Sequence, residues 1–151
     1  MDVRPLDERA MDEALRLAGA TGRMGNVPVG AVIVVDDTIV AAAANLRETL
    51  QDPTAHAELL VLREAAARQG SWRLEDATMI VTLEPCAMCA AAIDQARIRR
   101  IVYGADEPKT GAVMNGPRLL DDRPIEIERG LRADESLTLL ENFFKKIRGR
   151  D

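Results

Sequence analysis

Histidine, cysteine and aromatic residues are scarce in this chain of 151 residues. The sequence has one histidine, His56, and two cysteines, Cys86 and Cys89, while the aromatic residues make up 3%. A single histidine excludes sites that are built from several histidines. Two cysteines three positions apart are a poor disulfide framework for a domain of this size, and in a reducing compartment such a pair more often indicates metal or redox chemistry.

Long apolar runs and an excess of positive charge are also absent. The longest mostly apolar stretches, Val27–Val35 and Pro85–Ile93, are far shorter than the roughly 20 residues of a membrane-spanning helix. No apolar segment follows the first residues, so we expect a cytoplasmic protein without a membrane partner. The net charge of −5 gives nucleic-acid binding no support, and such binding would need a local basic patch.

Hydrophobic periodicity predicts a single domain over residues 1–151 in which helices alternate with short strands. We expect a turn at Asp36–Asp37 and loops over 45–53 and 106–122. The predicted helices cover 6–20, 55–69, 86–97 and 133–147, and the predicted strands cover 27–35, 38–44, 78–82, 101–103 and 125–128. This order indicates a three-layer α/β/α sandwich, with the third and fourth strands parallel through a right-handed crossover.

One histidine and two cysteines form a set of three good zinc ligands. His56 lies at a predicted helix start, and Cys86 and Cys89 open the next predicted helix, one turn apart. A helix N-terminus favours thiolates. Three protein ligands leave the fourth tetrahedral position to water, which is the pattern of a catalytic zinc site rather than a structural one.

Glu58 is the candidate catalytic group. Two positions along a regular helix lie about 200° apart, so His56 and Glu58 share a site only if the chain is still entering the helix. Thr54 is the expected cap that makes this arrangement possible. A carboxylate beside zinc-bound water can take its proton, because zinc lowers the pKa of that water to about 7.

Simpler interpretations exist for each half of this pattern. A lone helical histidine is usually a surface or core residue, and a lone Cys-x-x-Cys is often redox-active or half of a structural zinc site. A structural site would need a fourth ligand from a carboxylate or a neighbouring chain, and a thioredoxin-like site would leave His56 and Glu58 without a role. The combined pattern, His-x-Glu followed by Pro-Cys-x-x-Cys, is the signature of zinc deaminases.

On these residues the chain resembles the cytidine deaminase-like superfamily, and within it the bacterial tRNA adenosine deaminases, which form inosine at the anticodon wobble position. The resemblance covers nearly the whole chain. The matching segments are Val27–Val32, Asn45, Asp52–Glu58, Val81–Cys89, Ala96–Ile98, Lys109–Ala112 and Phe143–Phe144 with the basic residues after it.

The resemblance implies a five-stranded mixed sheet between helices and one zinc ion per chain, held by His56, Cys86 and Cys89. It further implies that Glu58 moves protons while water attacks C6 of adenine and ammonia leaves.

The resemblance also implies a substrate pocket and a partner. An asparagine matching Asn45 hydrogen-bonds the base in this family, and Val29 and Leu83 match apolar pocket positions. The partner would be a tRNA anticodon loop, and the enzyme a homodimer whose active sites border the other subunit.

Several segments depart from the family pattern and bear on substrate choice. Segment 113–124 is shorter than in the family, Asp121–Asp122 replaces an Asn-His pair, Glu107 replaces an aspartate, and Ala41–Ala44 replaces a more varied stretch. A deaminase of a free nucleobase or nucleoside, of guanine, cytosine or triazine type, is therefore the alternative. A zinc-stabilised binding module without enzymatic activity is a third hypothesis.

Basic and aromatic residues offer possible contacts with RNA. The tail Lys145–Arg150 is either a solvated helix end or a phosphate contact, and Arg97–Arg100 would add to it if both lay near the zinc site. For Phe143–Phe144 we expect core packing rather than base stacking, and for Trp72 and Tyr103 packing as well. An open, basic pocket mouth would favour a polymer substrate, and a mouth closed by the last helix a small molecule.

Overall fold

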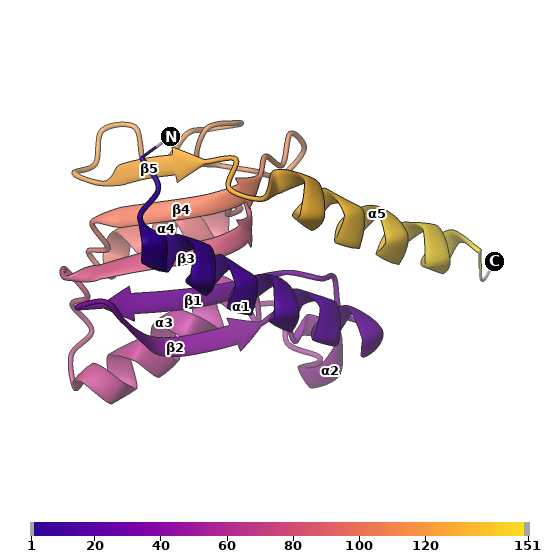
Figure 1. The fold of residues 1–151 in the computed structure, drawn as a ribbon, viewed down its shortest axis with the longest axis horizontal. Coiled ribbons are helices and arrows are strands. Elements are labelled where there is room, and N and C mark those ends of the chain that lie inside the picture. The colour runs from indigo at the N-terminus through magenta and orange to yellow at the C-terminus, as the bar shows by residue number, and fades with distance from the viewer. Residues whose placement is uncertain (1, 150–151) are drawn as a thin grey trace.

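The computed structural model describes residues 2–149 and has a five-stranded sheet with helices on both faces (Figure 1). The strand order is β2-β1-β3-β4-β5. The elements are α1 (Pro5–Arg23), β1 (Gly30–Val35), β2 (Thr38–Ala44), α2 (Arg47–Leu50), α3 (Ala57–Gln69), β3 (Ala77–Leu83), α4 (Ala87–Gln95), β4 (Arg100–Ala105), β5 (Glu126–Arg129) and α5 (Ala133–Arg148). The predicted sandwich with a mixed sheet is confirmed, since β1 is antiparallel to β2 and β3 while β3, β4 and β5 are parallel.

Two apolar cores lie on opposite faces of the sheet because side chains alternate along each strand. Val32, Ile80 and Val102 point to the face that α1 covers, and all three are fully buried. Their neighbours in the same strands, including Ile33 and Met79, pack against α3 and α4 on the other face. The central strands are therefore apolar on both sides, as expected for a sheet between two helical layers.

The first strand begins later than predicted, at Gly30 instead of Val27. Pro28 has no N–H for a sheet ladder, and the Val29 amide donates to the Val27 carbonyl at 2.9 Å, which turns the chain. At Gly30 a Cβ would overlap the carbonyl oxygen of Ala14 in α1. Glycine therefore lets α1 lie close to β1, and the turn leaves Val29 just before the strand, with its carbonyl accepting from the Asn45 amide at 3.0 Å.

Helix α2 was not predicted, since residues 45–53 were expected to form a loop. Its first turn is capped from a distance: the Asn26 side-chain oxygen accepts hydrogen bonds from the backbone N–H groups of Glu48 and Thr49, at 2.9 and 3.0 Å. Asn26 is fully buried. The cap supplies partners for amides that a helix start leaves unpaired, and it comes from a residue that local sequence does not link to this segment.

The expected cap of α3 was also wrong. Thr54 uses both its amide and its hydroxyl to bind the Asp52 carboxylate, at 2.8 and 2.7 Å. The N-cap residue is His56, with an extended backbone at φ −72° and ψ 150°. The helix therefore begins two residues later than predicted, at Ala57.

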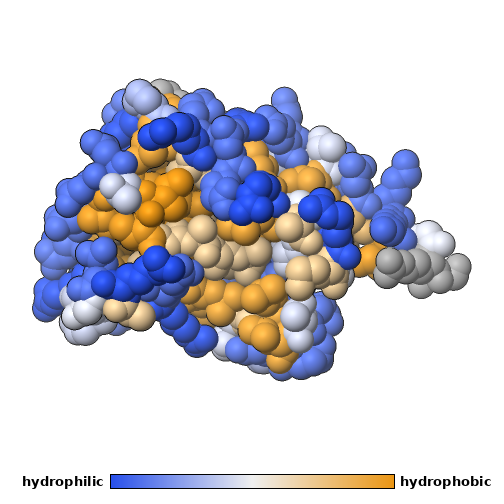
Figure 2. Space-filling model, turned by 60° about the horizontal axis from the view of Figure 1, so that its bottom comes forward, coloured by the Kyte–Doolittle hydropathy of each residue, from blue (hydrophilic) through white to orange (hydrophobic). Residues whose placement is uncertain are grey.

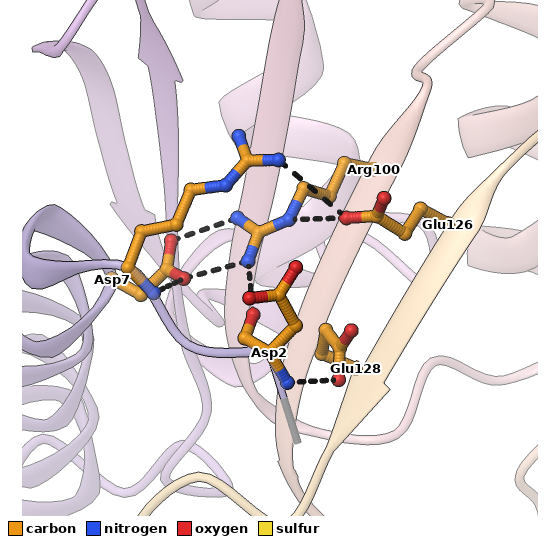
Figure 3. A network of polar contacts seen from close by, with 6 residues as sticks. Asp2, Asp7, Arg100, Glu126 and Glu128 are labelled. Atoms are coloured by element: carbon orange, nitrogen blue, oxygen red, sulfur yellow. Dashed lines mark hydrogen bonds and ion pairs between the residues drawn. The ribbon is translucent and has the colours of Figure 1, made fainter.

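Arg100 is buried at the start of β4, where it joins three segments of the chain (Figure 3). Its guanidinium donates to both carboxylate oxygens of Asp7 at 2.8 and 2.7 Å, to Glu126 at 2.9 Å and to the backbone carbonyl of Asp2 at 2.9 Å. These contacts tie the first turn of α1 to β4 and β5. Among residues 2–149, no helix combines the length and apolarity needed to cross a membrane.

Asp7→Asn is expected to lower the free energy of unfolding by about 3 kcal/mol at pH 7, because Arg100 would stay buried with less compensation. Burial alone raises the pKa of Asp7, but hydrogen bonds from Arg100 and from the Arg4 amide outweigh it and lower the pKa. The ionised carboxylate therefore stabilises the fold above about pH 4, and this contribution is lost as the pH falls through the lowered native pKa.

Urea unfolding of both proteins at several pH values checks this prediction. The difference between them should shrink below about pH 4. Glu13→Gln is the control, because it breaks an exposed pair with Arg16 and should cost about 0.5 kcal/mol or less. Equal losses for the two variants, or a difference for Asp7→Asn that does not change with pH, would contradict the assignment.

Candidate active site

The imidazole of His56 and the sulfurs of Cys86 and Cys89 converge at one point. The His56 Nδ1 atom lies 3.6 Å from Cys86 Sγ and 3.5 Å from Cys89 Sγ, and the three ligand atoms lie within 4.8 Å of one another. In a tetrahedral site with Zn–N near 2.1 Å and Zn–S near 2.3 Å, nitrogen and sulfur ligands are about 3.6 Å apart. The donor set and its spacing therefore fit a single zinc ion.

Two helix starts bring these ligands together. His56 is the N-cap residue of α3, Cys86 is the N-cap residue of α4, and Cys89 lies in the first turn of α4. The positive ends of both helices favour negative charge at this point. A hydrogen bond from Cys89 lowers the pKa of Cys86 to about 4 against the effect of burial, and His56 adds to the lowering. Cys86 is thus readily a thiolate, the form that binds zinc.

Glu58 lies in the first turn of α3 with its side chain 4% exposed. Burial raises its pKa to about 7, the neighbouring Cys86 contributes in the same direction, and His56 opposes the shift. A carboxyl group with a pKa near neutral can both accept and donate a proton under physiological conditions. His56 precedes α3 and Glu58 lies within its first turn. The chain is therefore still entering the helix at His56, which is the condition under which the two residues can share one site.

A cavity of about 240 Å³ opens beside these groups. It is smaller than typical sites for drug-sized ligands, which measure about 300–1,000 Å³, and suits a single heterocycle. Asn45, Val29 and Leu83, the three predicted substrate-contacting residues, all line it. The other lining residues are Val27, Arg47, His56, Ala57, Glu58, Glu84, Cys86, Glu107, Thr110, Leu140 and Phe144.

Comparison with known proteins agrees with this geometry. Residues 4–105 match the family model of the cytidine and deoxycytidylate deaminase zinc-binding region. The chain belongs to this zinc-dependent deaminase family. It is 43% identical over 146 residues to the tRNA-specific adenosine deaminase of Bacillus subtilis, covering 94% of this chain and 91% of that protein.

Solved structures extend the comparison. A structure from a study of A-to-I editing by tRNA:A34 deaminases matches with a TM-score of 0.84 at 44% identity, over 87% of this chain and 99% of that one. The guanine deaminase of Bacillus subtilis matches with a TM-score of 0.63 at 39% identity, over 66% of this chain and 64% of that one.

The side-chain amide of Asn45 holds the rim of the deaminase cavity in place. Its Nδ2 donates to the Val27 carbonyl at 3.1 Å, and its Oδ1 accepts from the Arg47 amide at 3.1 Å. A carboxamide has two donors and two acceptor lone pairs, so each atom has capacity for a further partner in the cavity. The structure thus places Asn45 on the cavity wall with hydrogen-bonding capacity to spare, and also gives it a structural role.

The last helix contributes an aromatic side chain to the cavity mouth. Phe144 is 43% exposed, so the expectation of core packing was wrong for this residue. Its ring meets Phe143 edge-to-face with centroids 5.3 Å apart. Phe144 also borders a neighbouring groove together with Met24 and Ile147. Helix α5 therefore flanks the opening and contributes an exposed aromatic ring to it.

The predicted second basic cluster lies away from the cavity. Arg100 is buried in the network of Figure 3, and neither Arg97 nor Arg99 lines the cavity. Arg97 instead approaches Trp72, which is 58% exposed and not a packing residue as expected. Tyr103 is fully buried, as predicted.

The cavity is not basic. Of the described lining residues, Arg47 is the only arginine or lysine, whereas Glu58, Glu84 and Glu107 are acidic. Among the basic residues that follow Phe144, the structure describes Lys145, Lys146 and Arg148, whereas Arg150 lies outside the described residues. Attraction of a polyanion to this opening would therefore depend on the end of α5.

Sequence analysis missed Glu84. Its carboxylate is 2% exposed and lines the cavity beside the zinc-ligand turn. The available signal was its place inside the matching segment Val81–Cys89, between the apolar strand and the first cysteine. Burial alone would raise the pKa of Glu84. Hydrogen bonds from several N–H groups to the carboxylate outweigh this effect, so the pKa is lowered and the group is held as an anion.

The purified deaminase is predicted to contain one zinc ion per chain, measured by plasma mass spectrometry after gel filtration. Cys89→Ser should lose most of this zinc and unfold at a lower temperature, because its ligand sulfur is removed from a buried position. Ser71→Ala, at an exposed position between α3 and β3, is the control and should keep its zinc. Full zinc occupancy in Cys89→Ser would contradict the ligand assignment.

Proposed function

We propose that this chain hydrolyses adenosine to inosine at the wobble position of a tRNA anticodon loop. One observation carries the proposal: a ligand set suited to zinc lies beside the buried Glu58, in a cavity of the size of one base. The similarity to tRNA-specific adenosine deaminases over 94% of the chain supports the choice of substrate. We further propose that residues 1–151 act as one domain in the cytoplasm.

In this proposal His56, Cys86 and Cys89 hold the metal and Glu58 handles protons. When bound, zinc supplies a nucleophilic water by lowering the pKa of that water to about 7. Glu58 takes a proton from the water and gives it to the ring nitrogen N1 of the base, and it then passes the second proton of the water to the departing amine. The C6–O bond forms, the C6–N bond breaks and ammonia leaves, so one water is consumed for each inosine formed.

Recognition of the base would rest on the walls of the cavity. Val29 and Leu83 supply apolar contacts to a heterocycle, and Asn45 supplies an amide for its polar edge. Because C6 cannot be reached inside a base stack, the target nucleotide must be looped out. In this proposal the exposed ring of Phe144 stacks on a neighbouring base, a contact worth about 1–3 kcal/mol in single-stranded nucleic-acid binding.

Phosphate contacts would come from the end of α5. Lys145, Lys146 and Arg148 follow Phe144 and are exposed. Such contacts make binding dependent on salt, which separates a polymer substrate from a free base.

A free-base deaminase is the second candidate, favoured by the match to the Bacillus subtilis guanine deaminase. That match covers a smaller share of both chains than the matches to tRNA deaminases, so RNA is the better-supported substrate. A binding module without turnover is the third candidate, and the buried Glu58 with its raised pKa argues against it.

Glu58→Gln is predicted to retain zinc and to lose turnover by about 10²–10⁴-fold, because the amide keeps the size of the side chain but cannot accept a proton. The assay measures inosine in an anticodon stem-loop with adenosine at the wobble position, and its matched control is Glu64→Gln, a substitution of a carboxylate that pairs with Arg68 in the same helix. Undiminished turnover in Glu58→Gln would contradict the catalytic role.

A substrate panel separates the three candidates for the wild-type protein. Conversion of the stem-loop without conversion of adenosine, guanine or cytosine supports the proposal. Conversion of a free base with the RNA untouched supports the second candidate, and no conversion of any substrate supports the third.

We also propose a homodimer that forms through the layer of α3 and α4. The outer positions of a surface helix are usually charged, but in α4 the exposed Ala87 and Ala91 and the half-buried Met88 are apolar. Figure 2 shows a further band of apolar surface on the side of β2, framed by hydrophilic side chains. A partner on α4 would lie next to Cys86 and hence close to the cavity.

Light scattering should give about twice the monomer mass of 16.5 kDa for the wild-type protein. Ala91→Glu should shift the population to monomers, since a dimer would bury the new charge. Arg16→Glu on α1, at the other face of the sheet, is the control and should remain dimeric. A monomeric wild-type protein at micromolar concentration would contradict the dimer.

A further inference from the structure

Both oxygens of the Glu84 carboxylate accept hydrogen bonds from the protein. One oxygen, Oε2, accepts from the amides of Val113, Met114 and Asn115 at 3.1, 2.8 and 2.9 Å. The other, Oε1, accepts from the Glu107 amide at 2.9 Å and from the Asn115 side chain at 2.6 Å. Both oxygens are thus occupied by donors from one segment, residues 107–115.

Segment 107–115 forms part of the cavity wall and contains no helix or extended strand. Glu107 and Thr110 from this segment line the cavity. Gly111 forms an isolated bridge with Cys86, and the Ala112 amide donates to the Pro85 carbonyl at 2.9 Å. The wall is therefore attached to the same turn that carries a zinc ligand.

Contact between the wall and Glu84 leaves no spare room. A Cβ added at Gly111 would lie 2.6 Å from the Glu84 carboxyl carbon, so the glycine lets the wall reach the carboxylate. Glu84 itself follows directly after β3 and precedes Pro85. The sheet thus fixes the position of Glu84, and Glu84 in turn fixes the position of the wall.

We propose that Glu84 is a positioning residue that holds the cavity wall 107–115 against the zinc-ligand turn. It thereby sets where Glu107 and Thr110 stand relative to the bound base. Glu84 acts through this wall and not on the reacting atoms. The part of the inference that concerns substrate binding rests on the proposed deaminase function, while the part that concerns the wall does not.

A carboxylate is needed because the wall offers donors to both oxygens. An ionised carboxylate has two acceptor oxygens and no donor, whereas a glutamine has one acceptor oxygen and an NH₂ group. In Glu84→Gln the NH₂ group of the new side chain would face N–H donors of the wall, and neither could accept a hydrogen bond. The wall must then move away at Glu107 or at 113–115, and buried donors left without partners are costly.

Glu84→Gln is expected to raise KM for the anticodon stem-loop by about tenfold or more, with a smaller change in kcat and with zinc content unchanged. Asn115→Ala removes one of the donors and should shift KM in the same direction by less. This second variant leaves the buried carboxylate in place, and it provides the test if Glu84→Gln does not yield folded protein.

Asp7→Asn is the matched control, because Asp7 is also a buried carboxylate but lies in the network of Figure 3, away from the cavity. It should lower stability without changing KM when the variants are compared at equal fractions folded. A rise in KM for Asp7→Asn equal to that for Glu84→Gln would overturn the proposal, since the effect would then follow stability alone. Loss of zinc from folded Glu84→Gln would also overturn it.

Hydrogen exchange tests the wall independently of any activity. Amides of 107–115 should exchange faster in Glu84→Gln than in the wild-type protein, and they should be unchanged in Asp7→Asn. Unchanged exchange in Glu84→Gln overturns the positioning role. Faster exchange in a protein that converts no substrate would support the role of Glu84 and reject the proposed function, so the two failures are distinguishable.

Discussion

The convergence of two helix starts on one point is the constraint on which the rest of the structure depends. His56 and Cys86 each occupy an N-cap position with extended backbone, and Cys89 follows within one turn. The resulting separations of 3.5 and 3.6 Å between the nitrogen and the two sulfurs suit a tetrahedral zinc ion. Because the cap position directs His56 out of the helix, Glu58 in the first turn can share the site.

The sheet and its polar contacts serve to keep these helix starts in place. Strand β3 leads directly to Glu84 and Cys86. The Glu84 carboxylate holds the cavity wall by accepting hydrogen bonds from its amides. On the other side of the molecule, Arg100 joins α1 to β4 and β5 (Figure 3). Both buried charged groups lie where segments distant in sequence meet, and each is tolerated there because it is fully hydrogen-bonded or paired.

Local sequence patterns predicted the fold and the metal site well, but they did not predict contacts between segments that are distant in the sequence. The spacing of Cys86 and Cys89 and the alternation of helices with strands are properties of short stretches, and the structure has both. Helix α2 was missed because its cap, Asn26, lies 22 residues before Glu48, whose amide it binds. Glu84 was missed for a similar reason, since its donors lie more than twenty residues later in a segment with no regular pattern. Exposure of Phe144 depends on how far α5 extends past the sheet, which periodicity within the helix does not reveal.

X-ray absorption at the zinc edge on the purified wild-type protein tests the central claim most directly. We predict two sulfur neighbours at about 2.3 Å, with one nitrogen and one oxygen at about 2.0–2.1 Å, the oxygen coming from solvent. A shell of this kind leaves one position for the reacting water. Three or four sulfur neighbours, or a second imidazole nitrogen from another chain, would describe a closed structural site and contradict a catalytic role for the metal.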